Sequence, residues 1–156
     1  MKAIRGGLLA GFFATVVVSM MMMIKTATGQ FPELHVVRTI GDVIGTPDNL
    51  VTAFGVHIFI GTVIWGIAFA MIESRIPVSS YAAKGALFGL FAWLLMMVVF
   101  MPLAGAGLFA SHRGSMYVPL ITLAYHLVFG LVLGNVYAWN IPSSKRTLER
   151  SVKTGA

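Results

Sequence analysis

The sequence predicts an all-α membrane protein, a bundle of four transmembrane helices built from two helical hairpins. Of its 156 residues, 58% are hydrophobic and only 10% are charged, whereas soluble domains carry about 25% charged residues. Four apolar stretches each approach or exceed the length needed to cross a bilayer, about 20 residues. The basic residues, which give a net charge of +6, flank these stretches. They are not interleaved with exposed aromatic residues, so we expect no nucleic-acid partner.

The first predicted span covers about residues 6–24 and follows the basic residues Lys2 and Arg5. This beginning resembles a secretory signal peptide, but the apolar region of such a peptide has only about 7–15 residues. The run here continues to Met23 without a cleavage site. We therefore expect an uncleaved transmembrane helix.

The second predicted span covers about residues 47–72 and begins at a helix-start signal. Thr46 can cap the helix, and Pro47 would occupy the first turn, where a missing N–H has no cost. The remaining segments are two further spans at about residues 84–104 and 116–139 and a polar tail at 140–156. Because the connections are short, we expect residues 1–156 to form a single domain.

The basic residues are distributed unequally between the two sides of the bundle. Eight lie on the side of the termini: Lys2, Arg5, Arg75, Lys84, Lys145, Arg146, Arg150 and Lys153. Three lie on the other side: Lys25, Arg38 and Arg113. The side richer in basic residues is normally cytoplasmic. We therefore expect both termini in the cytoplasm.

The long loop between the first two spans contains an amphipathic segment at about residues 32–40. Leu34, Val37 and Ile40 share one helical face, while polar residues occupy the others. This pattern is typical of a short helix in the membrane interface. An irregular loop packed over the bundle is the alternative.

An internal repeat relates the two halves of the chain. The string G-x-L-x-G-x-F-A begins at Gly7 and again at Gly85. The motif H-x-x-x-G occurs at His57 and again at His126. Both hairpins start on the same side, so the repeat is parallel and its pseudo-twofold axis should follow the membrane normal. The G-x-x-x-G patterns within the repeat predict close helix packing.

His57 and His126 are the main candidates for a functional site, because ionisable side chains within a membrane usually face the bundle interior. At equal depth on diagonally related helices, the two imidazoles could hold the iron of haem b. Gly61 and Gly130 would leave a flat slot for the macrocycle. Arg38 and Arg113 in the outer loops could pair with the propionates. The alternative is that each histidine only hydrogen-bonds a neighbouring helix.

Methionines in the outer halves of the first and third spans form a second candidate site. These are Met20, Met21, Met22, Met23, Met96, Met97 and Met101. Thioethers suit Cu(I), and Met97 and Met101 would share a helical face, with His35 or His112 adding an imidazole. Methionine is also an ordinary filler of apolar interiors, and that is the alternative.

The sequence disfavours several other functions. Its five acidic residues, Glu33, Asp42, Asp48, Glu73 and Glu149, are all expected outside the bilayer core. Proton- and cation-coupled transporters usually need carboxylates inside it. Cysteine is absent, and no hydrolase motif occurs. We expect no enzymatic activity from the chain on its own.

The layout of the chain resembles a family of small four-span bacterial inner-membrane proteins of unknown function. The R-G-G-L-x-x-G opening at Arg5 and the two H-x-x-x-G turns carry this resemblance. It implies a bacterial inner membrane as the location and no particular activity. The first expectation is an accessory or scaffolding subunit of a larger respiratory or redox complex, bound to other membrane subunits or to copies of itself. The alternative is a membrane electron carrier with haem b.

Overall fold

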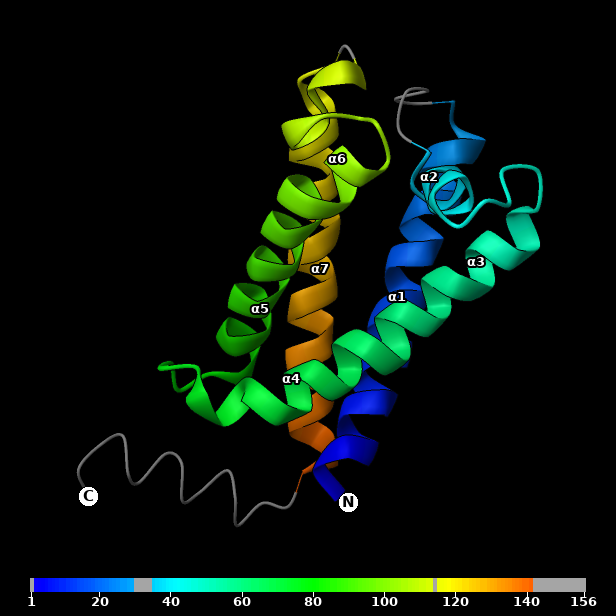
Figure 1. Cartoon of the computed structure of the whole chain (residues 1–156). Coiled ribbons are helices and arrows are strands. Elements are labelled where there is room, and N and C mark those ends of the chain that lie inside the picture. Colours follow the sequence, from blue (N-terminus) through cyan, green and yellow to red (C-terminus); the bar gives the residue numbers. More distant parts are fainter. Residues whose placement is uncertain (1, 30–34, 114, 142–156) are drawn as a thin grey trace, which may run out of the picture.

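The four predicted membrane spans are confirmed in the computed structural model, which describes residues 2–29, 35–113 and 115–141 (Figure 1). The helices long and apolar enough to cross a membrane are Lys2–Ala27, Leu50–Arg75, Tyr81–Leu103 and Tyr117–Asn140. Helix α1 (Lys2–Ala27) begins and α7 (Tyr117–Asn140) ends at the same end of the bundle (Figure 1). We name this the inner end and the opposite one the outer end.

Two of the four spans are interrupted by π-helical segments. The second span consists of α3 (Leu50–Phe59), a π-helix (Ile60–Trp65), α4 (Gly66–Ile72) and a 3₁₀ turn (Glu73–Arg75). The third consists of α5 (Tyr81–Leu95), a π-helix (Met96–Phe100) and α6 (Met101–Leu103). A 3₁₀ segment, Leu108–Arg113, then leads towards α7. Pro102 has no N–H to donate, and this accounts for irregular bonding at the second π-helix.

The prediction that Thr46 caps the second span is wrong. The cap is Asn49, whose side-chain oxygen accepts a hydrogen bond from the Thr52 N–H at 3.0 Å. Thr46 lies in the preceding turn, where its N–H donates to the Gly41 carbonyl at 2.8 Å. The chain leaves α2 through Gly45, at φ +74°, and completes this turn before the new helix can start.

The segment between the first two spans forms the helix α2 (Val36–Val43), which lies against α3 (Figure 1). The helix predicted in this loop is therefore present, displaced towards the C-terminus. Leu34, one of the three residues on its expected apolar face, lies outside the described residues. Val37 and Ile40 are half-buried. The alternative interpretation, an irregular loop, does not hold for these residues, and a position of the helix in the membrane interface stays a prediction.

The first hairpin is held together by glycines in direct backbone contact. Gly7 faces the Gly66 carbonyl, and a Cβ added at Gly11 would lie 2.7 Å from the Gly61 carbonyl oxygen. Real side chains do not tolerate such distances, so only glycine allows α1 to approach the second span this closely. We refer to these contacts as the first glycine seam.

The second hairpin contains a matching second glycine seam between α5 and α7. Gly85 lies against the Gly130 carbonyl, Gly89 against the carbonyl of His126, and Gly134 against that of Tyr81. The packing predicted from the G-x-x-x-G patterns is therefore confirmed. Because both seams use glycine on both helices, each hairpin has a fixed separation and a fixed register.

The π-helix in the second span accommodates a one-residue difference between the two repeats. In the second span the two seam glycines, Gly61 and Gly66, are five positions apart, whereas Gly130 and Gly134 in the fourth are four apart. A π-turn bonds residue i to i+5 and so contains one extra residue. This insertion brings Gly66 back to the seam despite the altered spacing.

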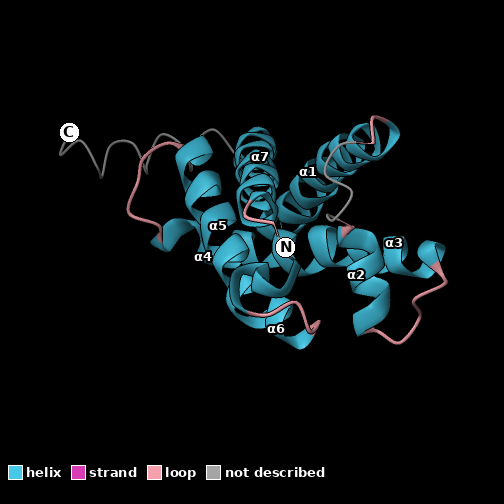
Figure 2. Cartoon of the chain, turned by 90° about the horizontal axis from the view of Figure 1, so that it is seen from above, coloured by secondary structure: helices cyan, strands magenta, loops and turns pink. Residues whose placement is uncertain are grey.

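The two hairpins meet along α1 and α7 and, in the inner half, also through α4, and they diverge in the outer half. In the inner half, Phe69 contacts the rings of Phe88 and Tyr137, with centroids 5.3 Å apart in both pairs. In the outer half, α3 packs chiefly on α2 and leans away from α5 and α7 (Figures 1 and 2). The divergence leaves space between the hairpins on the side of the histidines.

We expect Gly85→Ala to destabilise the bundle, since its methyl group would meet the Gly130 carbonyl and force the helices apart. The free energy of unfolding in detergent should fall by about 1–3 kcal/mol. The matched control is Gly55→Ala, because a Cβ at Gly55 has no atom within 4 Å. Equal stability of the two variants would contradict the seam.

Candidate functional site

A pocket of about 220 Å³ lies between the hairpins in their outer halves, and both His57 and His126 line it. Its walls come from all four spans and from α2, and they are largely apolar. Beside the two histidines, the lining includes Met22, Val36, Gly61, Met96, Met101 and Tyr125. We call this space the histidine pocket. The structure thus brings together the two side chains that the sequence singles out.

One hydrogen bond orients the ring of His126. Its Nδ1 lies 2.7 Å from the backbone carbonyl oxygen of Thr122, one helical turn earlier. A carbonyl only accepts, so Nδ1 carries the proton and donates it. In the neutral ring Nε2 then keeps its lone pair. Metal-binding histidines are usually held in this way, through a carbonyl that fixes the tautomer.

One ring nitrogen of His57 is buried. Its Nε2 has no hydrogen-bond partner among the described residues. The Phe54 ring lies beside it, with centroids 6.0 Å apart. A buried polar atom without a partner is costly, and native structures usually contain few. The alternative role for the histidines was a hydrogen bond to a neighbouring helix. It does not account for His57 Nε2, which has no such bond to a described residue. It does not account for His126 Nδ1 either, because that atom bonds within its own helix.

Both π-helices border the histidine pocket and turn side chains into it. Ile60 and Trp65 line it from the first, and Met96 and Met101 from the end of the third span. Within each pair the residues are five positions apart, a spacing that puts side chains on different faces of an α-helix. The wider π-turn brings them to one face. Segments of this kind are rare and are found frequently at functional sites.

Six of the seven candidate methionines fall into three groups in the structure, and the seventh, Met21, is half-buried against the core. Met22, Met96 and Met101 line the histidine pocket. Met97 is fully buried in the core and does not line it, so the predicted Met97 and Met101 pair does not form a site there. Met20 and Met23 are exposed. The two loop histidines expected to assist a copper site, His35 and His112, do not line this pocket either.

The flat slot expected below both histidines is only partly present. Gly61 lines the histidine pocket, but the space beside its Cα is filled by the Thr15 side chain. Gly130 is absent from the lining, because α5 covers it at Gly85. The expectation for Gly130 is therefore corrected: it serves the second glycine seam.

Arg38, one of the two arginines proposed as propionate partners, does not line the histidine pocket. Arg38 lines an adjoining pocket at the outer end, which shares Met22, Val36 and Tyr125 with the first. The side chain of Arg113 lies outside the described part of the chain. Arg38 therefore provides a cation in the pocket next to the histidine pocket.

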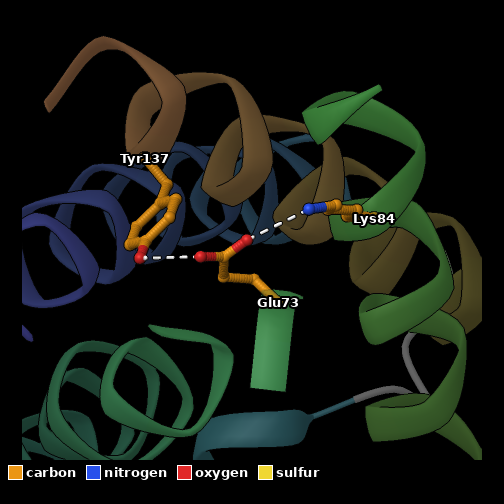
Figure 3. A network of polar contacts seen from close by, with 3 residues as sticks. All are labelled: Glu73, Lys84 and Tyr137. Atoms are coloured by element: carbon orange, nitrogen blue, oxygen red, sulfur yellow. Dashed lines mark hydrogen bonds and ion pairs between the residues drawn. The ribbon is translucent and has the colours of Figure 1, made fainter. Parts of the chain in front are cut away.

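A buried ion pair at the inner end was not anticipated from the sequence. Glu73 Oε2 lies 3.1 Å from Lys84 Nζ, and each side chain is only 1% exposed. The Tyr137 hydroxyl donates to Glu73 Oε1 at 3.4 Å (Figure 3). The Lys84 ammonium also lies 4.5 Å from the centroid of the Tyr81 ring. Glu73, Lys84 and Tyr137 come from three different spans, so this polar network ties the hairpins together.

The network changes how the acidic residues are interpreted. Asp42 and Asp48 are exposed, as expected, while Glu33 and Glu149 lie outside the described residues. Glu73 is at the inner helix end, as expected, but it is buried within the bundle instead of solvated. The sequence signal was available: Lys84 begins the next span across a short turn. Because Lys84 compensates its charge, Glu73 still gives no support for a cation-coupled transporter.

The model of a family of unknown function, DUF6789, matches residues 1–147. No curated protein and no solved structure matches the chain. The residues of the site itself are therefore the guide to the function of this chain.

We expect Glu73→Gln and Lys84→Met each to destabilise the protein by about 3–5 kcal/mol, because each leaves a buried charge without its partner. The double variant should lose less than the sum of the two, and a double-mutant cycle of unfolding in detergent measures this coupling. Arg75→Gln, an exposed neighbour, is the control and should stay within about 0.5 kcal/mol. Additive losses would contradict the pairing.

Proposed function

We propose that this chain, which belongs to the DUF6789 family, holds a b-type haem between its two hairpins and moves an electron within the membrane. The observation that carries the proposal is the meeting of two imidazoles in one apolar pocket. Both side chains line this pocket, each from a different hairpin. Imidazole is a common axial ligand of haem iron.

The donor atoms fit this cofactor. His126 is oriented through its Nδ1 proton, which leaves Nε2 as a ligand atom. His57 offers a buried Nε2 that has no partner among the described residues. The apolar walls suit a macrocycle and exclude water, and Arg38 in the adjoining pocket is a candidate partner for a propionate. Bound haem would supply reversible one-electron chemistry.

We expect protein purified in mild detergent, after expression with sufficient haem, to show a Soret band and sharp reduced α and β bands. His57→Ala and His126→Ala should each abolish or strongly reduce the bound haem, measured as the pyridine haemochrome per chain. The control is His112→Ala, whose histidine is exposed and lies outside the histidine pocket. It should leave the haem content unchanged.

Two results would count against haem. Colourless protein that remains folded would refute it, as would haem that survives in both pocket variants. Metal analysis of the same sample tests the Cu(I) alternative. Copper that is lost in Met96→Leu and Met101→Leu, without any haem spectrum, would replace the proposal with a thioether site.

A second candidate function is that of an accessory subunit in a larger respiratory or redox complex. The observation that favours it is the poor coverage of the second span. In the apolar 18-residue stretch of this span only 17% is buried within the chain, whereas the corresponding stretch of Lys2–Ala27 is 39% buried. This span therefore offers a face for a partner helix. Our proposal includes a bacterial inner membrane as the location, with both termini in the cytoplasm, and the excess of basic residues on the side of the termini supports this orientation.

We expect a photo-crosslinking residue at Phe59, which is 54% exposed on the second span, to give a discrete protein adduct in native membranes. The matched control is Phe13 on α1, 51% exposed, which should give lipid adducts only. An adduct at twice the mass of the chain would identify a homo-oligomer. Lipid adducts alone at both positions would contradict the subunit hypothesis.

A further inference from the structure

Trp93 joins α5 to the turn of α7 that precedes His126. Its indole Nε1 donates to the Pro119 carbonyl oxygen at 3.0 Å and lies 3.3 Å from the Thr122 hydroxyl oxygen. The helices α5 and α7 lie side by side (Figure 1). One N–H of α5 therefore reaches two acceptors of α7, and both belong to the same helical turn.

Thr122 connects this indole to the imidazole of His126. Its hydroxyl accepts from Trp93 and donates to the Val118 carbonyl at 2.8 Å. Its own carbonyl oxygen accepts from His126 Nδ1 at 2.7 Å. Thr122 is only 1% exposed, so its hydroxyl is shielded from solvent. Trp93 therefore restrains the residue whose carbonyl sets the tautomer of His126.

The second glycine seam restrains α7 on the other side of this contact. Gly89, one helical turn before Trp93 on α5, lies against the backbone carbonyl of His126. The helix α5 therefore contacts α7 at Thr122 and again at His126, one turn apart. Two contacts on the same face hold both the depth and the rotation of the α7 segment that lies between them.

The first hairpin lacks this arrangement. The internal repeat places Thr15 and Ala53 where the second hairpin has Trp93 and Thr122. The Thr15 hydroxyl donates to a carbonyl of its own helix at 2.7 Å, and alanine has no polar side-chain atom. His57 therefore has no counterpart of the link from indole to hydroxyl. The link is a specific feature of the second hairpin and does not follow from the repeat.

We propose that Trp93 is a positioning residue for His126. By restraining Thr122 it keeps the imidazole proton on Nδ1 and leaves Nε2 as the ligand atom. Metal-binding histidines commonly depend on such outer partners, which fix both the tautomer and the orientation of the ring. The functional value of this positioning rests on the proposed haem binding, but the tautomer itself is a property of the protein without haem. A tryptophan that only filled space would contribute to stability and leave the tautomer unchanged.

NMR of the histidine ring nitrogens, in the full chain with isotopically labelled histidine and without haem, tests the proposal. The signals of His126 are those lost in His126→Gln, and the pH is one at which imidazole is neutral. Trp93→Phe keeps an aromatic ring beside Phe109 and removes the N–H. We expect the ratio of the Nδ1–H to the Nε2–H tautomer of His126 to fall about fivefold, the usual weight of one hydrogen bond.

The matched control is Trp65→Phe. Trp65 lines the histidine pocket from the other hairpin, and its indole donates no hydrogen bond to a described residue. This variant should keep the tautomer ratio of wild type. Replacing Trp93 with benzothienylalanine, in which sulfur takes the place of the N–H, removes the donor while retaining the shape of the side chain. It should lower the ratio as Trp93→Phe does.

An unchanged ratio in the benzothienylalanine protein, or an equal fall in Trp65→Phe, would overturn the role of Trp93. Haem is measured separately, as the pyridine haemochrome of protein expressed with sufficient haem. A lowered ratio in a protein that never binds haem would therefore refute the haem proposal and support the positioning of His126 by Trp93.

Discussion

Backbone contact at glycines is the constraint on which the rest of this structure depends. In both hairpins a glycine on one helix faces a carbonyl of the other, so each hairpin has a separation that no larger residue permits. In a membrane, helices gain little from burying apolar side chains against one another, because lipid is equally apolar. Close backbone packing therefore carries much of the association. The seams hold the helices of each hairpin together and leave the outer halves of the two hairpins free to diverge.

The seams also set the position of the histidines. His57 and His126 each stand one helical turn before a seam glycine, Gly61 and Gly130 respectively. Fixing the glycine therefore fixes the depth and rotation of the imidazole above it. The π-helix at Ile60–Trp65 accommodates the extra residue between Gly61 and Gly66, and so keeps both glycines on the seam. Its side chains enter the histidine pocket as a consequence, which links a difference between the repeats to the geometry of the site.

Buried polar groups have hydrogen-bond partners at the inner end of the bundle, whereas one in the outer half has none among the described residues. At the inner end, Glu73 is matched by Lys84 and by the Tyr137 hydroxyl, so its charge is compensated within the protein. In the outer half, His57 Nε2 has no partner within the described part of the chain. A polar atom left unsatisfied in an apolar pocket is the feature expected of a ligand site, whereas a satisfied pair is expected of a structural one. This contrast is the reason for placing the proposed cofactor at the histidines.

The sequence by itself determined the four spans, the repeat and the two histidines as candidates. A membrane-spanning helix requires a long apolar run, and such a run can be recognised in the sequence. The regular spacing of small residues can be recognised there as well. The sequence pattern does not determine how each helix is rotated about its own axis, and only the tertiary structure decided this rotation. Rotation buried Glu73 against Lys84, turned Gly130 onto α5 and directed Met101, but not Met97, into the histidine pocket. Each outcome depends on neighbours that are distant in sequence and on π-turns that shift the helical register.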